Sequence, residues 1–329
     1  MKTFYETLDE YLAIKQKTLK EYSFEGVKFR VKRLKEMIAD IELKYLYTEE
    51  IQEYVDEWQK KYSAATIKAY LVIIKEVLKT NGIYLNEIKV QNSKPKRLRL
   101  YSEYEIELLE KCLSRTKIKH NHLAIPIAMY TGLRIGEILA LQWLDIDLNR
   151  RLISISKNSV RIQGKGTITQ EPKTQASIRE VAIPQQLYDI LIKFQPKEDE
   201  DWSLFVTSNK EKPQSVRTAQ RSAERIFVIA GVEYKGFHSF RHSYATRMVE
   251  KGIPVKAISD LLGHSNINTT LNIYSHTSND FKKECVDKVF KDENYDYEKK
   301  KEQEKKELYQ QILEIQKTMN ELLMKVSSF

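Results

Sequence analysis

The spacing of apolar residues predicts helices over most of residues 1–92. The first helix carries an apolar stripe at Phe4, Leu8, Tyr11 and Leu12, and a second stripe with helical spacing lies between residues 27 and 38. Thr48 can begin a third helix. Ser63 can cap a fourth, which would end at Asn81-Gly82, because a hydroxyl accepts from first-turn N–H groups and glycine suits the turn that ends a helix. The sequence therefore predicts a small helical domain over residues 1–92.

The pattern becomes mixed after residue 100. Residues 103–113 and 122–130 have helical spacing, and helical spacing returns after Pro184 and again up to Gly231. Between them, the segments LISIS, VRIQ, TITQ and REVAIP alternate apolar and polar positions as strands do. PKTQASIREVAIP indicates a hairpin with Lys173 at or beside its tip. We therefore predict a mainly helical protein whose second domain, residues 101–290, is mixed and mostly helical with a small antiparallel sheet.

A basic joint, SKPKRLRL, separates the two predicted domains, and we place the boundary at residues 93–100. A soluble linker and a strap laid along a DNA backbone both explain this composition. The positive side chains that would contact DNA in the second case are Lys94, Lys96, Arg97 and Arg99.

The last residues, 291–329, form a charged tail that ends in a short heptad helix. A Lys/Glu run comes first, and an apolar seam with 4-3-4-3-4 spacing follows at Leu308, Ile312, Ile315, Met319, Leu322 and Val326. Such a seam packs either on a neighbouring subunit or on its own chain. The exposed character of the preceding run favours the neighbour.

Composition narrows the class of partner. The 329 residues carry a formal net charge of +9, which favours a polyanion, and nucleic acid before a membrane surface. No apolar run approaches the ~20 residues that span a bilayer, and the N-terminus lacks the apolar core of a secretory signal. Two cysteines far apart give neither a disulfide framework nor a zinc spacing, so we expect a cytoplasmic protein associated with the nucleoid.

Side chains suited to phosphodiester chemistry concentrate between His238 and Tyr274. His238 and Arg241 are three apart and share one helix face. An arginine there can grip a phosphate through its fork of N–H donors. His264 follows the helix-ending Gly263, and the next helix would carry Tyr274. A tyrosine hydroxyl, with a usual pKa of about 10, needs a nearby base and positive charge to become a nucleophile.

A second candidate stretch is TGLRIGEILALQW. Arg134 lies between two glycines that permit close backbone approach, which makes it either a phosphate contact or a structural partner of Glu137. An exposed lysine of the strand region is a candidate proton donor. Lys173 is preferred, and Lys157 and Lys165 compete with it.

With these residues in view, the chain resembles the tyrosine recombinase family of phage integrases and Xer-type resolvases. TGLRIGEILAL resembles its first arginine box, HSFRHSYAT its H-x-x-R box, and LLGHSNINTTLNIYSH its histidine-then-tyrosine box, while PKTQASIR is similar to its lysine segment. The matching residues over positions 100–285 are Arg134, Lys173, His238, Arg241, His264 and Tyr274.

The resemblance implies a C-shaped clamp of two domains around duplex DNA, with residues 1–92 as the core-binding domain. Tyr274 would attack the scissile phosphate to give a 3′-phosphotyrosyl bond, Arg134 and Arg241 would hold the non-bridging oxygens, and Lys173 would protonate the leaving 5′-oxygen. On the fourth helix, Lys68, Tyr70 and Lys75 are candidate DNA contacts, although a solvated helix face explains each of them.

In the same family scheme His238 would act as acid and base for Tyr274, His264 would donate to the phosphate, and Glu137 would orient the site. The scheme uses no metal or other cofactor, and the sequence holds no Walker motif and no carboxylate cluster for Mg²⁺. The expected active form is a tetramer on two DNA sites, with DNA-bending accessory factors as further partners.

Three other functions stay open at this stage. A Xer-like resolvase would use the same chemistry to resolve dimers instead of moving a mobile element. A type IB topoisomerase would relax supercoiled DNA as a monomer. A non-catalytic regulator would use VKAISDLLGHSNINTTLNIY as a helix-turn-helix, but it leaves Arg134, Lys173, His238 and Tyr274 unexplained.

Overall fold

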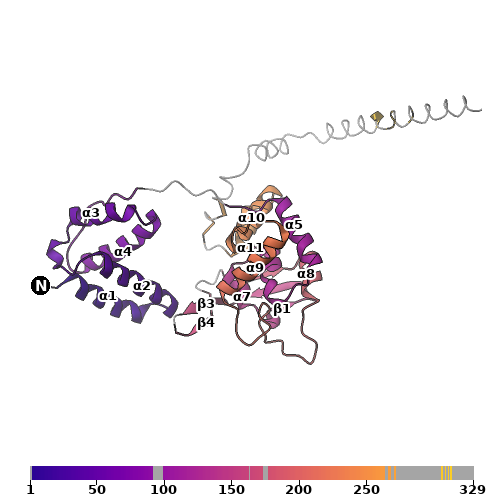
Figure 1. Cartoon of the computed structure of the whole chain (residues 1–329), viewed down its shortest axis with the longest axis horizontal. Coiled ribbons are helices and arrows are strands. Elements are labelled where there is room, and N and C mark those ends of the chain that lie inside the picture. Colours follow the sequence, from indigo (N-terminus) through magenta and orange to yellow (C-terminus); the bar gives the residue numbers. More distant parts are fainter. Residues whose placement is uncertain are drawn as a thin grey trace, which may run out of the picture. The chain divides into compact units, whose positions relative to one another are not determined.

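The computed structural model (Figure 1) describes residues 2–91, 99–162, 164–172 and 177–263, together with 266, 267, 270, 271, 305, 306, 308, 310 and 312. The chain divides into two compact units, residues 1–270 and residues 271–329. Within the first unit the buried apolar side chains form two clusters. One lies between Phe4 and Ile88 and the other between Tyr101 and Phe240.

The N-terminal region is helical, as predicted. Its elements are α1 (Phe4–Thr18), α2 (Glu21–Met37), η1 (Leu43–Tyr45), α3 (Thr48–Gln59) and α4 (Ala64–Thr80). The predicted Ser63 cap of α4 is confirmed, since the Ser63 hydroxyl accepts from the Thr66 N–H. Asn81 and Gly82 end that helix with backbone bonds to its last turn.

The three residues of α4 that are predicted to contact DNA differ in their exposure. Lys68 and Lys75 are exposed. Tyr70 is 4% exposed, and its ring packs edge-on against Trp58 at 5.8 Å and Tyr62 at 6.0 Å between centroids. The prediction that Tyr70 contacts DNA is therefore wrong for this structure, because the apolar face of α4 turns the ring into the core.

The second region is mixed. Its helices are α5 (Glu103–Arg115), η2 (His120–His122), α6 (Ala124–Thr131), α7 (Ile135–Ala140), η3 (Trp143–Asp145), α8 (Gln185–Leu191), α9 (Val216–Ala230), α10 (Phe237–Glu250) and α11 (Val255–Leu262). Its strands are β1 (Ile146–Asp147), β2 (Leu152–Ile155), β3 (Asn158–Ile162), β4 (Gly166–Gln170) and β5 (Arg179–Ala182). The predicted fold class, mainly helical with small antiparallel sheets, is confirmed.

The strands form two sheets, and their pairing corrects one prediction. Strands β1, β2 and β5 make one antiparallel sheet, in which Ile153 pairs with Val181, and β3 and β4 make a hairpin. The segment PKTQASIREVAIP does not form the predicted hairpin, because β5 pairs with β2 rather than with β4. The observed hairpin turns at Gly164 and Gly166, which adopt φ values of 83° and 80° that favour glycine. Periodicity identifies strands but not their partners.

The core of the second region fixes the helices that carry the candidate site. Helix α6 is almost wholly buried, and α10 and α7 pack beside it. The aromatic rings of Tyr101, Phe227 and Phe240 meet at 4.5–5.9 Å and anchor α10 and α9 to the chain entering α5. Among the described residues, no helix is both long enough and apolar enough to cross a membrane.

Candidate active site

The first arginine box is a tight connection between two helices. Gly132 ends α6 in the left-handed conformation, with φ 63°, and Arg134 is the extended residue immediately before α7. A Cβ on Gly136 would lie 2.2 Å from the Asn158 Oδ1 atom, so glycine lets β3 pack directly on the first turn of α7. This packing brings β3 against the helix turn that follows Arg134.

Glu137 holds that arginine from one turn further along α7. Its Oε2 accepts from the Arg134 backbone N–H and its Oε1 accepts from Nη1 of the same residue, both at 2.9 Å. The Arg134 side chain is 40% exposed, while that of Glu137 is 6% exposed. The structure thus combines both interpretations of the box, because Arg134 pairs with Glu137 and still reaches the surface.

The H-x-x-R box lies on α10. His238 is exposed in the first turn of the helix, and Arg241, three residues later, is 3% exposed. Arg241 donates from Nη1 to the Gly132 carbonyl at 3.0 Å and from Nη2 to the Leu262 carbonyl at 2.7 Å. These contacts tie α10 to the end of α6 and to the end of α11.

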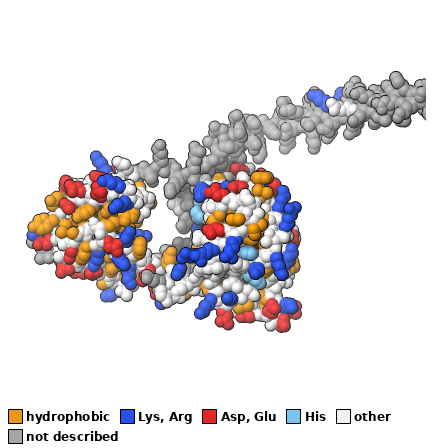
Figure 2. All heavy atoms as spheres, in the orientation of Figure 1, with side chains coloured by type: hydrophobic (Ala, Val, Ile, Leu, Met, Phe, Trp, Pro, Cys, Tyr) orange, Lys and Arg blue, Asp and Glu red, His pale blue; other side chains and the backbone are white. Residues whose placement is uncertain are grey.

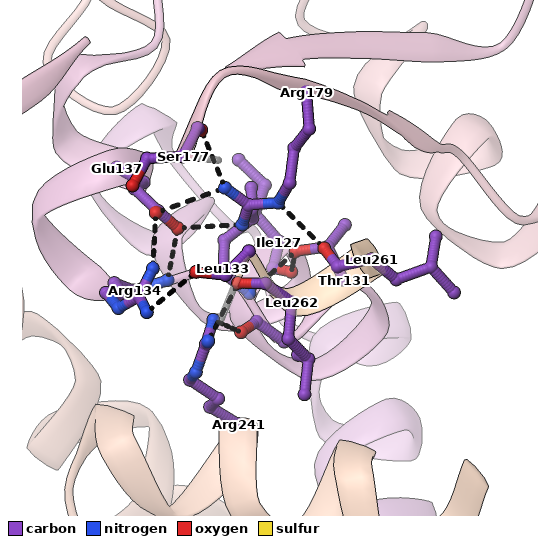
Figure 3. A network of polar contacts seen from close by, with 12 residues as sticks. Ile127, Thr131, Leu133, Arg134, Glu137, Ser177, Arg179, Arg241, Leu261 and Leu262 are labelled. Atoms are coloured by element: carbon purple, nitrogen blue, oxygen red, sulfur yellow. Dashed lines mark hydrogen bonds and ion pairs between the residues drawn. The ribbon is translucent and has the colours of Figure 1, made fainter. Parts of the chain in front are cut away.

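The C-terminal end of α11 is where the arginines meet (Figure 3). The carbonyls of three consecutive residues each accept from a different arginine. Leu261 accepts from Nε of Arg179, Leu262 from Arg241, and Gly263 from Nη2 of Arg134 at 3.2 Å. The last carbonyls of a helix lack intrahelical partners and carry its negative partial charge, so guanidinium groups suit them. This end therefore gathers three positive charges beside the position where His264 follows.

Burial, followed by the neighbouring positive charges, lowers the pKa values of Arg241 and His238. Burial, followed by the charge of Arg134, lowers the pKa of Arg241 to about 9. Partial burial of its ring and the charges of Arg241 and Arg134 lower the pKa of His238 as well. A neutral imidazole at neutral pH can accept a proton, as a general base must.

Burial pushes the pKa of Glu137 up, but the bonds and charges of Arg179 and Arg134 lower it overall. Glu137 is therefore ionised. Its negative charge balances part of the positive charge of the arginines.

The structure brings together only part of the predicted site. Arg134, Glu137 and Arg241 lie around the end of α11, and His238 is three residues before Arg241 on α10. Lys173, His264 and Tyr274 lie outside the described residues. The same is true of the linker residues Lys94, Lys96 and Arg97. Arg99 is described and exposed, and it pairs with Glu233.

The two competing lysines have different surroundings. Lys157 Nζ lies 2.9 Å from Asp145 Oδ2 and 2.5 Å from Gln142 Oε1. Lys165 is exposed at the β3–β4 turn, and its Nζ lies 2.7 Å from Glu21 Oε1. Both lysines therefore form ion pairs, and these contacts do not single out one of them as the proton donor.

Arg179 is the residue that the sequence analysis missed. Its side chain is 8% exposed and donates to both carboxylate oxygens of Glu137, at 3.2 and 3.1 Å. One signal in the sequence was available. Arg179 is two residues before the buried Val181 on β5, and positions two apart in a strand share a face.

One face of the second region carries many basic side chains. Figure 2 shows Lys and Arg side chains gathered in a band across the face of the second region, with histidine side chains beside them. Within the described residues, no group of three or more His, Cys, Asp or Glu side chains could hold a metal ion.

Comparison with known proteins places these features in a family. Residues 99–280 match the phage integrase family. The chain is 35% identical to "Tyrosine recombinase XerC-like" of Caldanaerobacter subterraneus subsp. tengcongensis over 54% of this chain and 50% of that protein, so it spans about half the length of this relative. It is 26% identical to the integrase of Staphylococcus phage L54a over 88% of this chain and 93% of that protein.

Solved structures show the same fold. The Tn1549 transposon integrase in complex with transposon right end DNA matches 88% of this chain and 99% of its own, with a TM-score of 0.72 and 20% identity. A lambda integrase tetramer bound to a Holliday junction matches 83% of this chain and 77% of its own, with a TM-score of 0.58 and 20% identity. Because the family match covers more than half of the chain and includes both arginine boxes and the stretch that carries Tyr274, this chain belongs to the phage integrase family of tyrosine recombinases.

Proposed function

We propose that this protein is a site-specific DNA recombinase that integrates and excises a mobile element. The observation that carries the proposal is the convergence of Arg134 and Arg241 at the end of α11, one residue before His264, with His238 on the same helix as Arg241. The match to a phage integrase over 93% of that relative's length supports the mobile-element role above the resolution of chromosome dimers.

In the proposed reaction the Tyr274 oxygen attacks the scissile phosphorus, and the bond from phosphorus to the 5′-oxygen breaks. His238 accepts the phenolic proton, which its lowered pKa favours, and Lys173 gives a proton to the departing 5′-oxygen. Arg134 and Arg241 neutralise the charge on the non-bridging oxygens, and His264 donates to one of them. The 5′-hydroxyl of the partner strand then attacks the phosphotyrosine and releases Tyr274.

We assign duplex DNA as the substrate and residues 1–92 as a core-binding domain. The exposed Lys68 and Lys75 of α4 suit phosphate contacts, and the basic joint at residues 93–100 connects this domain to the catalytic residues 101–290. We propose a tetramer on two sites as the active form, by analogy with the lambda integrase tetramer on a Holliday junction.

The test is covalent trapping on suicide DNA. Duplexes drawn from the DNA that flanks the gene are nicked near each candidate site, so that the short 5′-hydroxyl fragment diffuses away after cleavage. Wild-type protein should give an adduct that survives denaturing electrophoresis, and Tyr274→Phe should bind the same DNA without forming it. Binding by the wild type without any adduct would instead support the helix-turn-helix regulator.

A second measurement separates the two catalytic alternatives. A type IB topoisomerase relaxes any supercoiled plasmid as a monomer. A recombinase needs two cognate sites and exchanges their strands. Exchange that depends on paired sites supports the proposal, and relaxation of a plasmid without such sites at the same rate would overturn it.

A further inference from the structure

We propose that Arg179 is a positioning residue for the scissile phosphate, acting through Glu137 and the end of α11. The inference rests on the proposed function, since it concerns the same site. Arg179 comes from β5, far from both arginine boxes in the sequence. It nevertheless contacts Glu137, which holds Arg134, and the Leu261 carbonyl, which is next to the Leu262 carbonyl that Arg241 binds.

Arg179 and Arg134 share the carboxylate of Glu137. Glu137 Oε1 accepts from Nη1 of both Arg134 and Arg179, and Oε2 accepts from the Arg134 backbone N–H and from Nη2 of Arg179. The Glu137 carboxylate is thus fixed on both oxygens by a buried guanidinium. A carboxylate held in this way can hold Arg134 in one direction, which a freely rotating one cannot.

Arg179 also contacts the end of α11. Arg179 Nε donates to the Leu261 carbonyl at 2.7 Å, and Nη1 also donates to the Ser177 carbonyl at 3.1 Å. A Cβ placed on Gly263 would lie 2.8 Å from Arg179 Nη1, so the guanidinium packs directly against the residue before His264. One side chain therefore contacts both the carboxylate that holds Arg134 and the backbone at the end of α11 (Figure 3).

Only a guanidinium can make this set of bonds. Its N–H groups point in three directions within one plane, which lets Nε reach Leu261 while Nη1 and Nη2 hold both oxygens of Glu137. The single nitrogen of lysine carries the same charge but cannot span these acceptors. The substitution Arg179→Lys keeps the charge and loses these hydrogen bonds, so it tests the bond geometry apart from the charge.

The experiment compares Arg179→Lys and Arg179→Gln with the wild type on the suicide DNA. We expect the single-turnover rate of adduct formation to fall about 10- to 100-fold in both variants, a range typical of residues that orient a functional group through a hydrogen bond. The DNA affinity of both variants should stay within about threefold of the wild-type value. Arg150→Gln is the matched control, because this arginine is 65% exposed and lies 3.8 Å from Glu180 of the same sheet. It should cleave at the wild-type rate.

A second substrate distinguishes positioning from a general loss of structure. In a methylphosphonate a methyl group replaces one non-bridging oxygen, so the scissile group is neutral and needs less help from Arg134. Relative to wild type, the defect of Arg179→Lys should shrink on methylphosphonate DNA, as the defect of Arg134→Ala should. Equal defects on the two substrates, or a wild-type rate on phosphate DNA, would overturn the role of Arg179.

Two controls keep the outcomes separate. If the wild type itself forms no adduct, the proposed function fails, whatever the Arg179 variants do. If Arg179→Gln does not fold, as judged by thermal unfolding, the folded Arg179→Lys protein and Glu137→Gln carry the test. Glu137→Gln should reproduce the smaller defect on methylphosphonate DNA.

Discussion

At the scale of single residues, the site depends on arginines that are not interchangeable. Arg134 is partly exposed, Arg241 is buried between two carbonyls, and Arg179 is buried against a carboxylate. Each of the three satisfies a different carbonyl at the end of α11. The positive charge that a phosphate would meet is therefore held by protein groups before DNA arrives, which is the preorganisation that electrostatic catalysis requires.

Gly263 should tolerate alanine less well than Gly252, because a Cβ at 263 would lie 2.8 Å from Arg179 Nη1. Gly263→Ala and Gly252→Ala both place a Cβ on a left-handed residue, at φ 64° and 74°, which costs about 1 kcal/mol. Only the Cβ at 263 meets a neighbour, Arg179, because nothing lies within 4 Å of a Cβ at 252. Urea unfolding should show similar losses of stability, and adduct formation should fall at least tenfold in Gly263→Ala alone. Equal cleavage by the two variants would contradict this contact.

At the scale of the helix, α10 carries two histidines one turn apart. The rings of His238 and His242 meet edge-to-face, with centroids 4.4 Å apart. Burial, followed by the charges of His238 and Arg241, lowers the pKa of His242 to about 4. The His242 imidazole therefore stays neutral in the folded protein in mild acid, whereas it would be protonated in the unfolded chain.

Acid should destabilise the protein in part through His242. Between the usual pKa of a histidine, about 6.5, and the folded value of about 4, the unfolded state binds a proton that the folded state does not, so stability falls as pH falls. The free energy of unfolding should drop by about 2 kcal/mol from pH 7 to pH 5 through this group. His242→Gln should reduce the drop in urea titrations at the two pH values. The same pH dependence in variant and wild type would rule out His242 as its source.

Helix α4 should bind phosphates through its exposed face only. Each phosphate contact contributes about 0.9 to the slope of log affinity against log salt, so the double variant Lys68→Ala, Lys75→Ala should lower that slope by about 2. Tyr70→Phe is the matched control from the buried face and should leave both affinity and slope unchanged. Fluorescence anisotropy at several salt concentrations measures both quantities. A loss of affinity in Tyr70→Phe without loss of stability would restore its predicted DNA contact.

At the scale of the whole molecule, the C-terminal tail is predicted to take part in the assembly of subunits. Leu308 and Ile312 of the predicted heptad seam are 58% and 46% exposed, and the rest of the seam lies outside the described residues. Apolar side chains at heptad spacing gain stability when a second surface covers them. We therefore retain a neighbouring subunit as the predicted partner of the seam.

Deletion of residues 300–329 should weaken assembly more than binding. We expect affinity for a single half-site to stay within about threefold of the full chain, because phosphate contacts elsewhere dominate it. Cooperative binding to a duplex with two half-sites should be lost, since the seam would no longer reach a neighbour. Electrophoretic mobility shifts on the two DNAs measure both quantities. Unchanged cooperativity would favour a seam that folds back on its own chain.

The sequence by itself determined the local elements and much of the chemistry. Apolar periodicity, the Ser63 cap and the left-handed Gly263 depend on residues a few positions apart, and the structure has them where the sequence predicts them. The recombinase resemblance came from boxes that are each contiguous, and the family match confirms it. The alternation of apolar and polar positions also predicts the strands β2, β3, β4 and β5.

Only the tertiary structure decided what these elements do to one another. It buried the Tyr70 ring in the core of the N-terminal region and paired β5 with β2 instead of β4. It also placed Arg179 between Glu137 and Leu261, which lie 42 and 82 positions away from it in the chain. Apolar periodicity and capping residues indicate the type of an element and where it ends, because both depend on residues that are close in the sequence. The partner of a buried guanidinium depends on how whole elements pack, and the pattern of one strand does not contain that information.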